Sequence, residues 1–348
     1  MTQTANEANK QHVWNYWKAL QSAGLNQALA VASEYLDDGH RWQGFDPVHD
    51  LDGPAGFVEG FWEPLLTSFP DVERHTWIFF GGKSSGRIDG TGDGRMWVTG
   101  TGVLRGRFAE DYLGIPANGD TVDIRWGEFC RLDDGRIVET FFLVDMIDLM
   151  QQAGFNVLPP SRGKDGIYPP PAAGDGVQKT PSDTARSDYS LDHIRRFIFD
   201  GLNSYDENNL ESMGMAAYFH PDLRWYGPGG IGACLSFQEF ETNHQAHWLH
   251  AFPDRSVQDL DALIAEGAYS GGPGWDGVIA TQKGEYLQHP ASGNRLGVNG
   301  LDWWKREGEQ YVENWVFVDM IHLFRQLGVD LMARLDQQKD RTSPGLER

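Results

Sequence analysis

The segment Val144-Asp145-Met146-Ile147 occurs twice in this chain, the second time as Val318-Asp319-Met320-Ile321. Both copies lie inside a longer match, in which residues 138–154 and 312–328 share nine identities at a constant offset of 174. Chance does not produce so dense a match. It indicates an internal repeat, and a chain of 348 residues has room for two domains of about 150 residues, each with its own core.

Earlier words of the sequence repeat in the same order, at an offset of 183. Arg41-Trp42-Gln43-Gly44 corresponds to 224–227, and Phe69-Pro70-Asp71 corresponds to 252–254. The change of offset from 183 to 174 predicts a longer hairpin connection in the first copy, within residues 81–94, which are rich in glycine. Prolines and glycines dominate the middle of the chain. We therefore expect domains at 1–158 and 186–340, joined by a linker at 159–185.

Each copy begins with helical spacing of apolar residues and continues with strand-like alternation. Helices are expected at the start of each copy and before each Phe-Pro-Asp word, where the proline ends the helix. The expected strands are 95–104, 121–132, 137–144, 277–287, 295–306 and 311–318. Helices followed by long antiparallel strands predict an α+β fold, with the sheet curled around the helices.

Composition excludes several partners. The formal net charge of −21 opposes binding to nucleic acid or to an anionic membrane surface. Only Cys130 and Cys234 are present, so neither a disulfide framework nor a cysteine zinc site is expected. No run of 18 apolar residues and no signal-like amino terminus occur, and a cytoplasmic location is expected.

The order of these words resembles the SnoaL-like polyketide cyclase family of the nuclear-transport-factor-2-like superfamily. In the first copy the resemblance covers nearly the whole length; in the second, Gly308-Glu309-Gln310-Tyr311 replaces the expected turn. The words that carry it are Trp42-Gln43-Gly44, Phe69-Pro70-Asp71, Gly114-Ile115-Pro116-Ala117-Asn118-Gly119, Asp134-Gly135-Arg136-Ile137-Val138-Glu139, Asp145 and Gln152-Ala153-Gly154.

The resemblance implies two tandem cone-shaped α+β barrel domains, each a curved antiparallel sheet wrapped around N-terminal helices, that form an intrachain pseudo-dimer. It also implies an apolar pocket and an aldol-type ring closure without metal or organic cofactor. In the cyclases the general acid/base is an aspartate on the last strand, and Asp145 and Asp319 match it. The alternative for each is to cap the helix that follows.

His244 is a third candidate catalytic residue, because it stands where the first copy has the core-facing Phe61. A satisfied core histidine is the alternative. Since His244, His247 and His250 follow one another at intervals of three along a helix, they do not converge on one metal ion, and no metal site is predicted.

Aromatic side chains on or near the predicted strands are candidates for substrate binding, with core or pseudo-dimer packing as the alternative. They are Trp42, Trp126, Phe141, Trp225, Trp303, Trp315 and Phe317. Arg125 and Glu128 flank Trp126 and become Asn299 and Asp302 in the second copy, at positions that suit either a pocket or an interface.

The leading hypothesis is therefore an enzyme that performs acid/base chemistry on a small hydrophobic or aromatic carbonyl compound: aldol-type cyclisation, isomerisation or a related lyase or hydrolase step. A non-catalytic small-molecule-binding or assembly module is the competing hypothesis. Division of labour between an active copy and a stabilising copy is a third. Further homo-oligomerisation is left open by the sequence.

Overall fold

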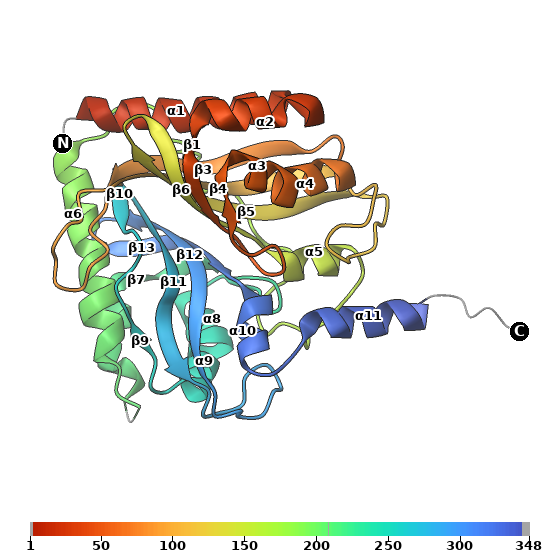
Figure 1. Ribbon diagram of the computed structural model, residues 1–348. Coiled ribbons are helices and arrows are strands. Elements are labelled where there is room, and N and C mark those ends of the chain that lie inside the picture. The colour runs from red at the N-terminus through yellow and green to blue at the C-terminus, as the bar shows by residue number, and fades with distance from the viewer. Residues whose placement is uncertain (1–2, 208, 343–348) are drawn as a thin grey trace, which may run out of the picture.

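The computed structural model describes residues 3–207 and 209–342, and there the chain forms two similar α+β units, each a curved sheet with helices against it (Figure 1). The strands of the first unit are β1 Leu36–Gln43, β2 Leu51–Asp52, β3 Glu73–Lys83, β4 Met96–Arg107, β5 Thr121–Asp133 and β6 Arg136–Val144. Its helical segments are α1 Gln3–Ser22, α2 Gly24–Tyr35, α3 Gly53–Phe57, η1 Val58–Trp62, α4 Glu63–Ser68 and α5 Met146–Gln152.

The second unit repeats this order. Its strands are β7 Phe219–Tyr226, β8 Ala233–Cys234, β9 Ser256–Val257, β10 Ile264–Glu266, β11 Tyr269–Thr281, β12 Arg295–Glu307 and β13 Gln310–Val318. Its helical segments are α6 Thr184–Arg195, η2 Arg196–Gly201, η3 Leu202–Ser204, η4 Leu210–Met213, α7 Met215–Tyr218, α8 Phe237–Phe240, η5 Glu241–Gln245, α9 Ala246–Ala251, α10 Met320–Gln326 and α11 Leu331–Thr342.

The predicted α+β class and tandem arrangement are confirmed, with two refinements of the sheet. The strand order is β2-β1-β6-β5-β4-β3 in the first unit and β10-β11-β12-β13-β7-β8 in the second, so both sheets are open and neither closes into a barrel. One pair in each is parallel, β1 with β6 and β7 with β13, whereas an antiparallel sheet was expected. The parallel pair arises because α3 and α4 carry the chain from β2 to the opposite edge at β3.

Five of the six expected strands match β4, β5, β6, β12 and β13, and no strand was expected at β1, β2, β3 or β7 to β10. The strand expected at 277–287 is β11, and it begins at Tyr269. Glycines at 271, 272, 274 and 277 and a register shift between Gly274 and Val278 hide its alternation. The long hairpin connection of the first unit lies at 84–95, between β3 and β4, whereas β10 and β11 are joined through residues 267–268.

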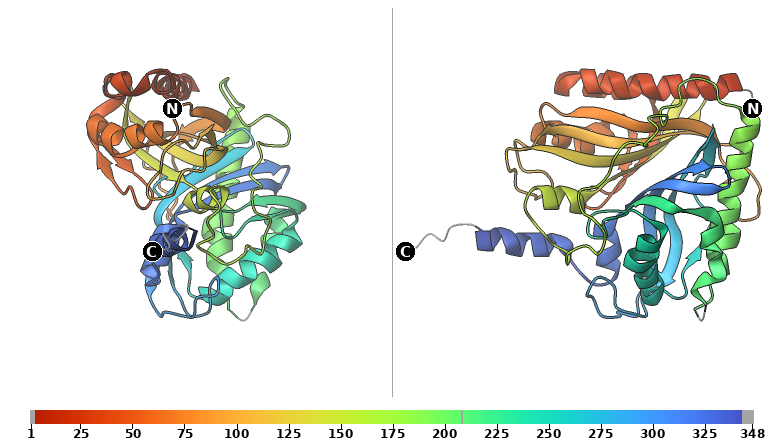
Figure 2. Two further views of the ribbon diagram at one scale, coloured as in Figure 1. Left: turned by 90° about the vertical axis from the view of Figure 1, so that its right-hand side faces the viewer. Right: turned by 180° about the vertical axis from the view of Figure 1, so that it is seen from behind.

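The two sheets pack against each other and form the intrachain pseudo-dimer (Figure 2). Trp303 of β12 stacks on Phe129 of β5 at 5.2 Å between ring centres, and its Nε1 donates to Thr99 Oγ1 at 3.0 Å. Phe141 contacts Trp275 at 4.8 Å. A side chain at Gly127 would collide with the Trp303 ring, so glycine there permits the close approach.

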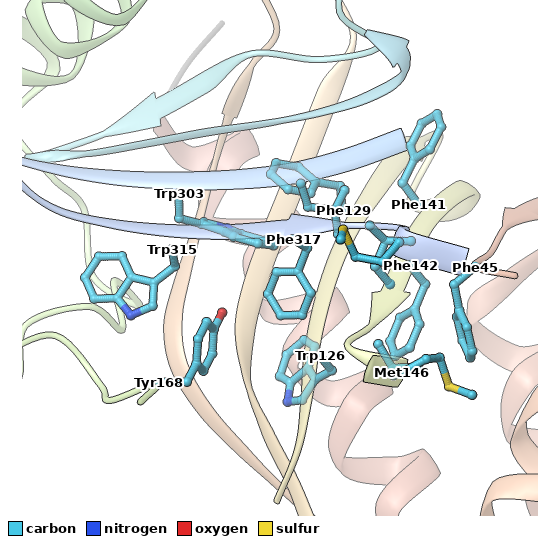
Figure 3. Close-up of a cluster of buried hydrophobic side chains, with 14 of the residues drawn as sticks. Phe45, Trp126, Phe129, Phe141, Phe142, Met146, Tyr168, Trp303, Trp315 and Phe317 are labelled. Atoms are coloured by element: carbon cyan, nitrogen blue, oxygen red, sulfur yellow. The ribbon is translucent and has the colours of Figure 1, made fainter. Parts of the chain in front are cut away.

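The linker contributes to this interface as well. Tyr168 is buried, its ring packs edge-on against Phe317 at 5.6 Å, and its hydroxyl lies 2.7 Å from Thr101 Oγ1 (Figure 3). The Pro169 carbonyl accepts a hydrogen bond from Trp315 Nε1 at 2.9 Å. The linker therefore fixes the two sheets together rather than acting as a free spacer.

Candidate functional site

The concave side of the first sheet is filled by aromatic side chains. Trp126 is fully buried; its ring lies nearly parallel to Phe142, with centres 6.5 Å apart, and edge-on to Trp17 at 5.2 Å. The guanidinium carbon of Arg74 lies 4.2 Å from the centre of the Trp126 ring. Phe61 packs on Phe142 at 4.9 Å. Side chains therefore fill the inside of the first cone, the space that a ligand would otherwise occupy.

The second sheet replaces the two central rings by small residues. Its strands β12 and β13 pair as β5 and β6 do, so that each position corresponds to the first-unit residue 174 places earlier. Trp126 becomes Gly300, and Phe142 becomes Val316. Both replacements line a cavity.

Two adjoining cavities, of about 180 and 190 Å³, occupy the second cone. Both are partly open hollows lined mainly by apolar side chains with a few polar groups, which is the lining typical of a small-molecule site. The walls shared by both cavities include Trp225, His244, Trp248, Asp302, Trp304 and Val316.

Asp302 places a carboxyl group on this otherwise apolar wall. It faces the cavity from β12, opposite Gly272 of β11, and Asn314 Nδ2 donates to its Oδ1 at 3.4 Å. Among residues 3–207 and 209–342 no cation lies within ion-pair distance of it. Desolvation raises the pKa of Asp302 to about 7, and the Asn314 hydrogen bond opposes this only in part.

The first unit shows why Asp302 is unpaired. Its counterpart Glu128 forms a buried ion pair with Arg74, at 2.7 Å. Arg74 pairs with Leu104 in the β3–β4 ladder, and the equivalent β9–β11 pair is Val257 with Val278. Replacement of the arginine by Val257 therefore leaves the acid without its cation.

His244 lies on η5 and lines both cavities. Its ring stacks on Trp225, with centres 4.4 Å apart and planes 20° from parallel. Burial, and then the neighbouring His247 and Arg255, lower the pKa of His244 to about 3. The imidazole is therefore neutral at neutral pH and offers one donor and one acceptor. His244 corresponds in the sequence to the core-facing Phe61 of the first unit, and in the structure it faces the cavity.

Asp145 and Asp319, the two candidate bases that the resemblance suggested, do not line the cavities of the second unit. Asp145 Oδ1 accepts from Asp148 N at 3.0 Å and so caps α5. Its Oδ2 accepts from Gly229 N, in the second unit, at 2.8 Å. Arg125 Nη1 lies 3.3 Å from the same oxygen.

Asp319 makes the reciprocal contacts. Its Oδ1 accepts from His322 N at 3.0 Å and caps α10, while Oδ2 accepts from Asp46 N of the first unit at 2.8 Å. Burial raises the pKa of Asp319 to about 7, although the hydrogen bonds from these donors act in the opposite direction. Since Asp46 and Gly229 are equivalent at the offset of 183, the two aspartates form a symmetric clasp between the units.

Strand alternation explains this placement. Successive side chains of a strand point to opposite faces, so Asp319 shares its face with Trp315 and Phe317, at the interface between the sheets. The opposite face of β13 carries Asn314 and Val316, which line the cavity of about 190 Å³, while Phe317 also borders the cavity of about 180 Å³. The helix-capping alternative weighed from the sequence is thus present in both copies.

The seven aromatic residues proposed as a substrate-binding wall fall into three places. Trp225 and Phe317 line the cavity of about 180 Å³ in the second unit. Trp42 and Trp126 belong to the filled core of the first unit. The remaining three lie buried at the interface between the sheets: Phe141, Trp303 and Trp315 (Figure 3).

A third cavity, of about 30 Å³, borders the first at His244 and Tyr286. Its other walls include the exposed side chains of Arg162 and Glu285. It therefore lies between the protein surface and the imidazole of His244.

Neither a metal-ligating cluster nor a membrane-spanning helix occurs in the part of the chain that the structure describes. No group of three or more His, Cys, Asp or Glu side chains there is placed to hold a metal ion. No helix within it is long and apolar enough to cross a bilayer.

Fold and cavities together define a tandem α+β protein in which the first cone is filled by side chains and the second is hollow. Residues 17–153, most of the first unit, match the model of the SnoaL-like polyketide cyclase family. No curated protein matches the chain.

Several solved structures resemble the chain. IdmH from Streptomyces antibioticus is 19% identical, with a TM-score of 0.33, and the match covers 40% of this chain and 99% of IdmH. TsrD from Streptomyces laurentii is 24% identical, with a TM-score of 0.32 and coverage of 42% and 97%. An NTF2-like protein from Burkholderia thailandensis is 17% identical, with a TM-score of 0.32 and coverage of 40% and 96%.

Proposed function

We propose that the second-unit cavity binds a small hydrophobic or aromatic carbonyl compound and that Asp302 transfers protons to and from it, in a cyclase-like reaction. The observation that carries the proposal is a carboxyl group without a cation, on the wall of an apolar cavity, with its pKa raised to about 7. Near neutral pH such a group is populated as both base and acid. The match of residues 17–153 to the SnoaL-like polyketide cyclase family supports a cyclase-like role.

The chemistry needs only one carboxyl group. As a carboxylate, Asp302 removes a proton from the carbon next to a carbonyl, and the C–H electron pair becomes an enolate. The enolate carbon attacks a second carbonyl of the same molecule, so that a C–C bond forms and an alkoxide results. The protonated Asp302 then returns its proton to the alkoxide.

His244 suits a supporting role in this scheme. A neutral imidazole can donate a hydrogen bond to the oxygen on which the enolate charge develops, and it does so without protonating the carbon. The rings of Trp225, Trp248 and Trp304 supply flat apolar walls for the substrate. We assign no proton transfer to Asp145 or Asp319, because both are engaged in the clasp.

Exchange of α-protons for deuterium tests the proposal without knowledge of the natural product. Small aromatic diketones are incubated with the full chain in D₂O, and exchange at the activated carbon is followed by proton NMR. We expect catalysed exchange in the native protein and a loss of about 10²- to 10⁴-fold in Asp302→Asn.

Asp319→Asn is the matched control, since Asp319 is a buried acid with a similarly raised pKa outside the cavity. Its exchange rate per folded molecule should stay near that of the native protein. Full exchange in Asp302→Asn, or ligand binding without exchange by the native protein, would instead identify the chain as a binding module or place the base elsewhere.

A further inference from the structure

Arg255 brings a second unpaired charge to the hollow cone. It lines the cavity of about 190 Å³ but not the adjoining one, which Gly300 lines. Its Nη2 donates to the Leu202 carbonyl at 3.1 Å and contacts Met213 Sδ at 2.7 Å, and its guanidinium carbon lies 5.5 Å from the centre of the Tyr205 ring. No carboxylate of the described residues lies within ion-pair distance of it.

The repeat shows that this arginine is a specific difference between the two cones. Asp71 and Asp254 accept equivalent backbone hydrogen bonds, from Arg107 and Thr281, which fixes the correspondence of the segments that follow them. In the first unit the next residue is the buried Val72, and in the second it is Arg255.

The positive charge has therefore moved along the segment relative to the acid. In the first unit Arg74 stands two residues further on and neutralises Glu128. In the second unit that place is taken by Val257, and the arginine lies two residues earlier, a displacement of roughly 7 Å along an extended chain. Asp302 and Arg255 are both left to face the cavity rather than each other.

The free guanidinium is costly unless a ligand satisfies it. Desolvation lowers the pKa of Arg255 to about 10, so it stays protonated at neutral pH. Such a planar group forms two parallel hydrogen bonds with a carboxylate, a geometry that a neutral ligand cannot reproduce. Apolar side chains form much of the rest of this cavity's wall, among them Phe197, Phe240 and Leu249.

We infer that Arg255 is an anion-binding subsite and that the ligand of the second unit is a small hydrophobic acid, with its carboxylate at Arg255 and its apolar body between the aromatic walls. The inference builds on the proposed function, since the carbonyl part of the same molecule then lies near Asp302 and His244, which border both cavities. The protein's net charge of −21 disfavours non-specific binding of anions, so a preference for an acid reports this local site.

A matched pair of probes tests the subsite by isothermal titration calorimetry: 2-naphthoate and 2-naphthylmethanol, which share a ring system and differ in charge. The native chain should bind the acid at least about tenfold more tightly than the alcohol. Arg255→Met should abolish that preference, and Arg255→Lys should retain part of it. Arg295→Met, at an exposed arginine of the same unit, should leave it unchanged.

Asp302→Asn separates this inference from the proposed function. It should lose α-proton exchange but keep, or strengthen, its preference for naphthoate, because a negative charge near the ligand has been removed. Equal affinity for the two probes in the native chain, retention of the preference in a folded Arg255→Met variant, or binding of neither probe would each overturn the anion subsite. Only failure of the exchange experiment bears on Asp302.

Discussion

Replacing Asp302 by asparagine should make the protein more stable, and by an amount that grows with pH. A carboxyl whose folded-state pKa is raised stabilises the fold below its unfolded pKa, and this contribution is lost as the pH rises through the folded pKa. For Asp302 the pKa rises from 3.8 to about 7, roughly 3 units, each worth 1.36 kcal/mol. The ionised group therefore costs the folded state about 4 kcal/mol in alkaline solution.

Most of that cost appears inside an accessible pH window. With pKa values of 3.8 unfolded and about 7 folded, linkage gives a penalty of about 1.7 kcal/mol at pH 5 and about 4 kcal/mol at pH 8.5. Asparagine has no such titration. The difference in free energy of unfolding between Asp302→Asn and the native chain should thus increase by about 3 kcal/mol from pH 5 to pH 8.5.

Urea denaturation of both proteins, followed by tryptophan fluorescence at pH 5 and pH 8.5, measures this difference. The other titrating groups are common to both proteins and cancel. A difference that is independent of pH would refute the reasoning, because Asp302 would then have an ordinary pKa and no special fitness for proton transfer at neutral pH. A stabilised variant that has lost α-proton exchange is the pattern expected of a functional group held at a cost.

Two further substitutions test the cavity and the clasp. Val316→Phe restores the first-unit residue and should fill the cavity. We expect it to raise the free energy of unfolding by about 1 kcal/mol and to abolish naphthoate binding. Calorimetry measures both effects, and unchanged binding would contradict the assignment of the ligand site. Asp319→Ala should lower the free energy of unfolding by about 2 to 4 kcal/mol, since it removes a helix cap and leaves the Asp46 N–H unpaired. Loss of α-proton exchange in a fully folded variant would instead support the catalytic role predicted from the sequence.

Much of the fold was predictable because the repeated residues are ones that determine local backbone structure. The Phe-Pro-Asp words end helices, and the alternation in β5, β6, β12 and β13 is regular. Where glycines replace alternating side chains, as in β11, the strand escaped prediction and its start was placed eight residues too late. The open ends of the sheets depend on pairing between distant strands, which local patterns do not specify.

The site was predicted only in part. His244 stood out because a polar residue replaced an apolar one on an inward helix face. Asp302 was recognised only as the counterpart of Glu128. Its importance depends on two replacements: Gly300 stands where the first unit has an aromatic ring, and Val257 stands where it has a cation. The aligned repeat shows these replacements to be relevant only once the pairing of the strands is known.

The comparison of the two units separates structure from function. Both units retain the aspartate that caps a helix and reaches across to the other unit, so this shared feature follows the interface. The two units differ inside the cones: aromatic rings and an arginine fill the first cone, and the second, which lacks them, is hollow. A duplicated chain that must keep its interface has no need to keep two cavities, and the filled unit can supply the stability that the hollow unit gives up. On this reasoning the residues that matter for ligand chemistry are those at which the copies disagree, with Asp302, His244 and Arg255 foremost among them.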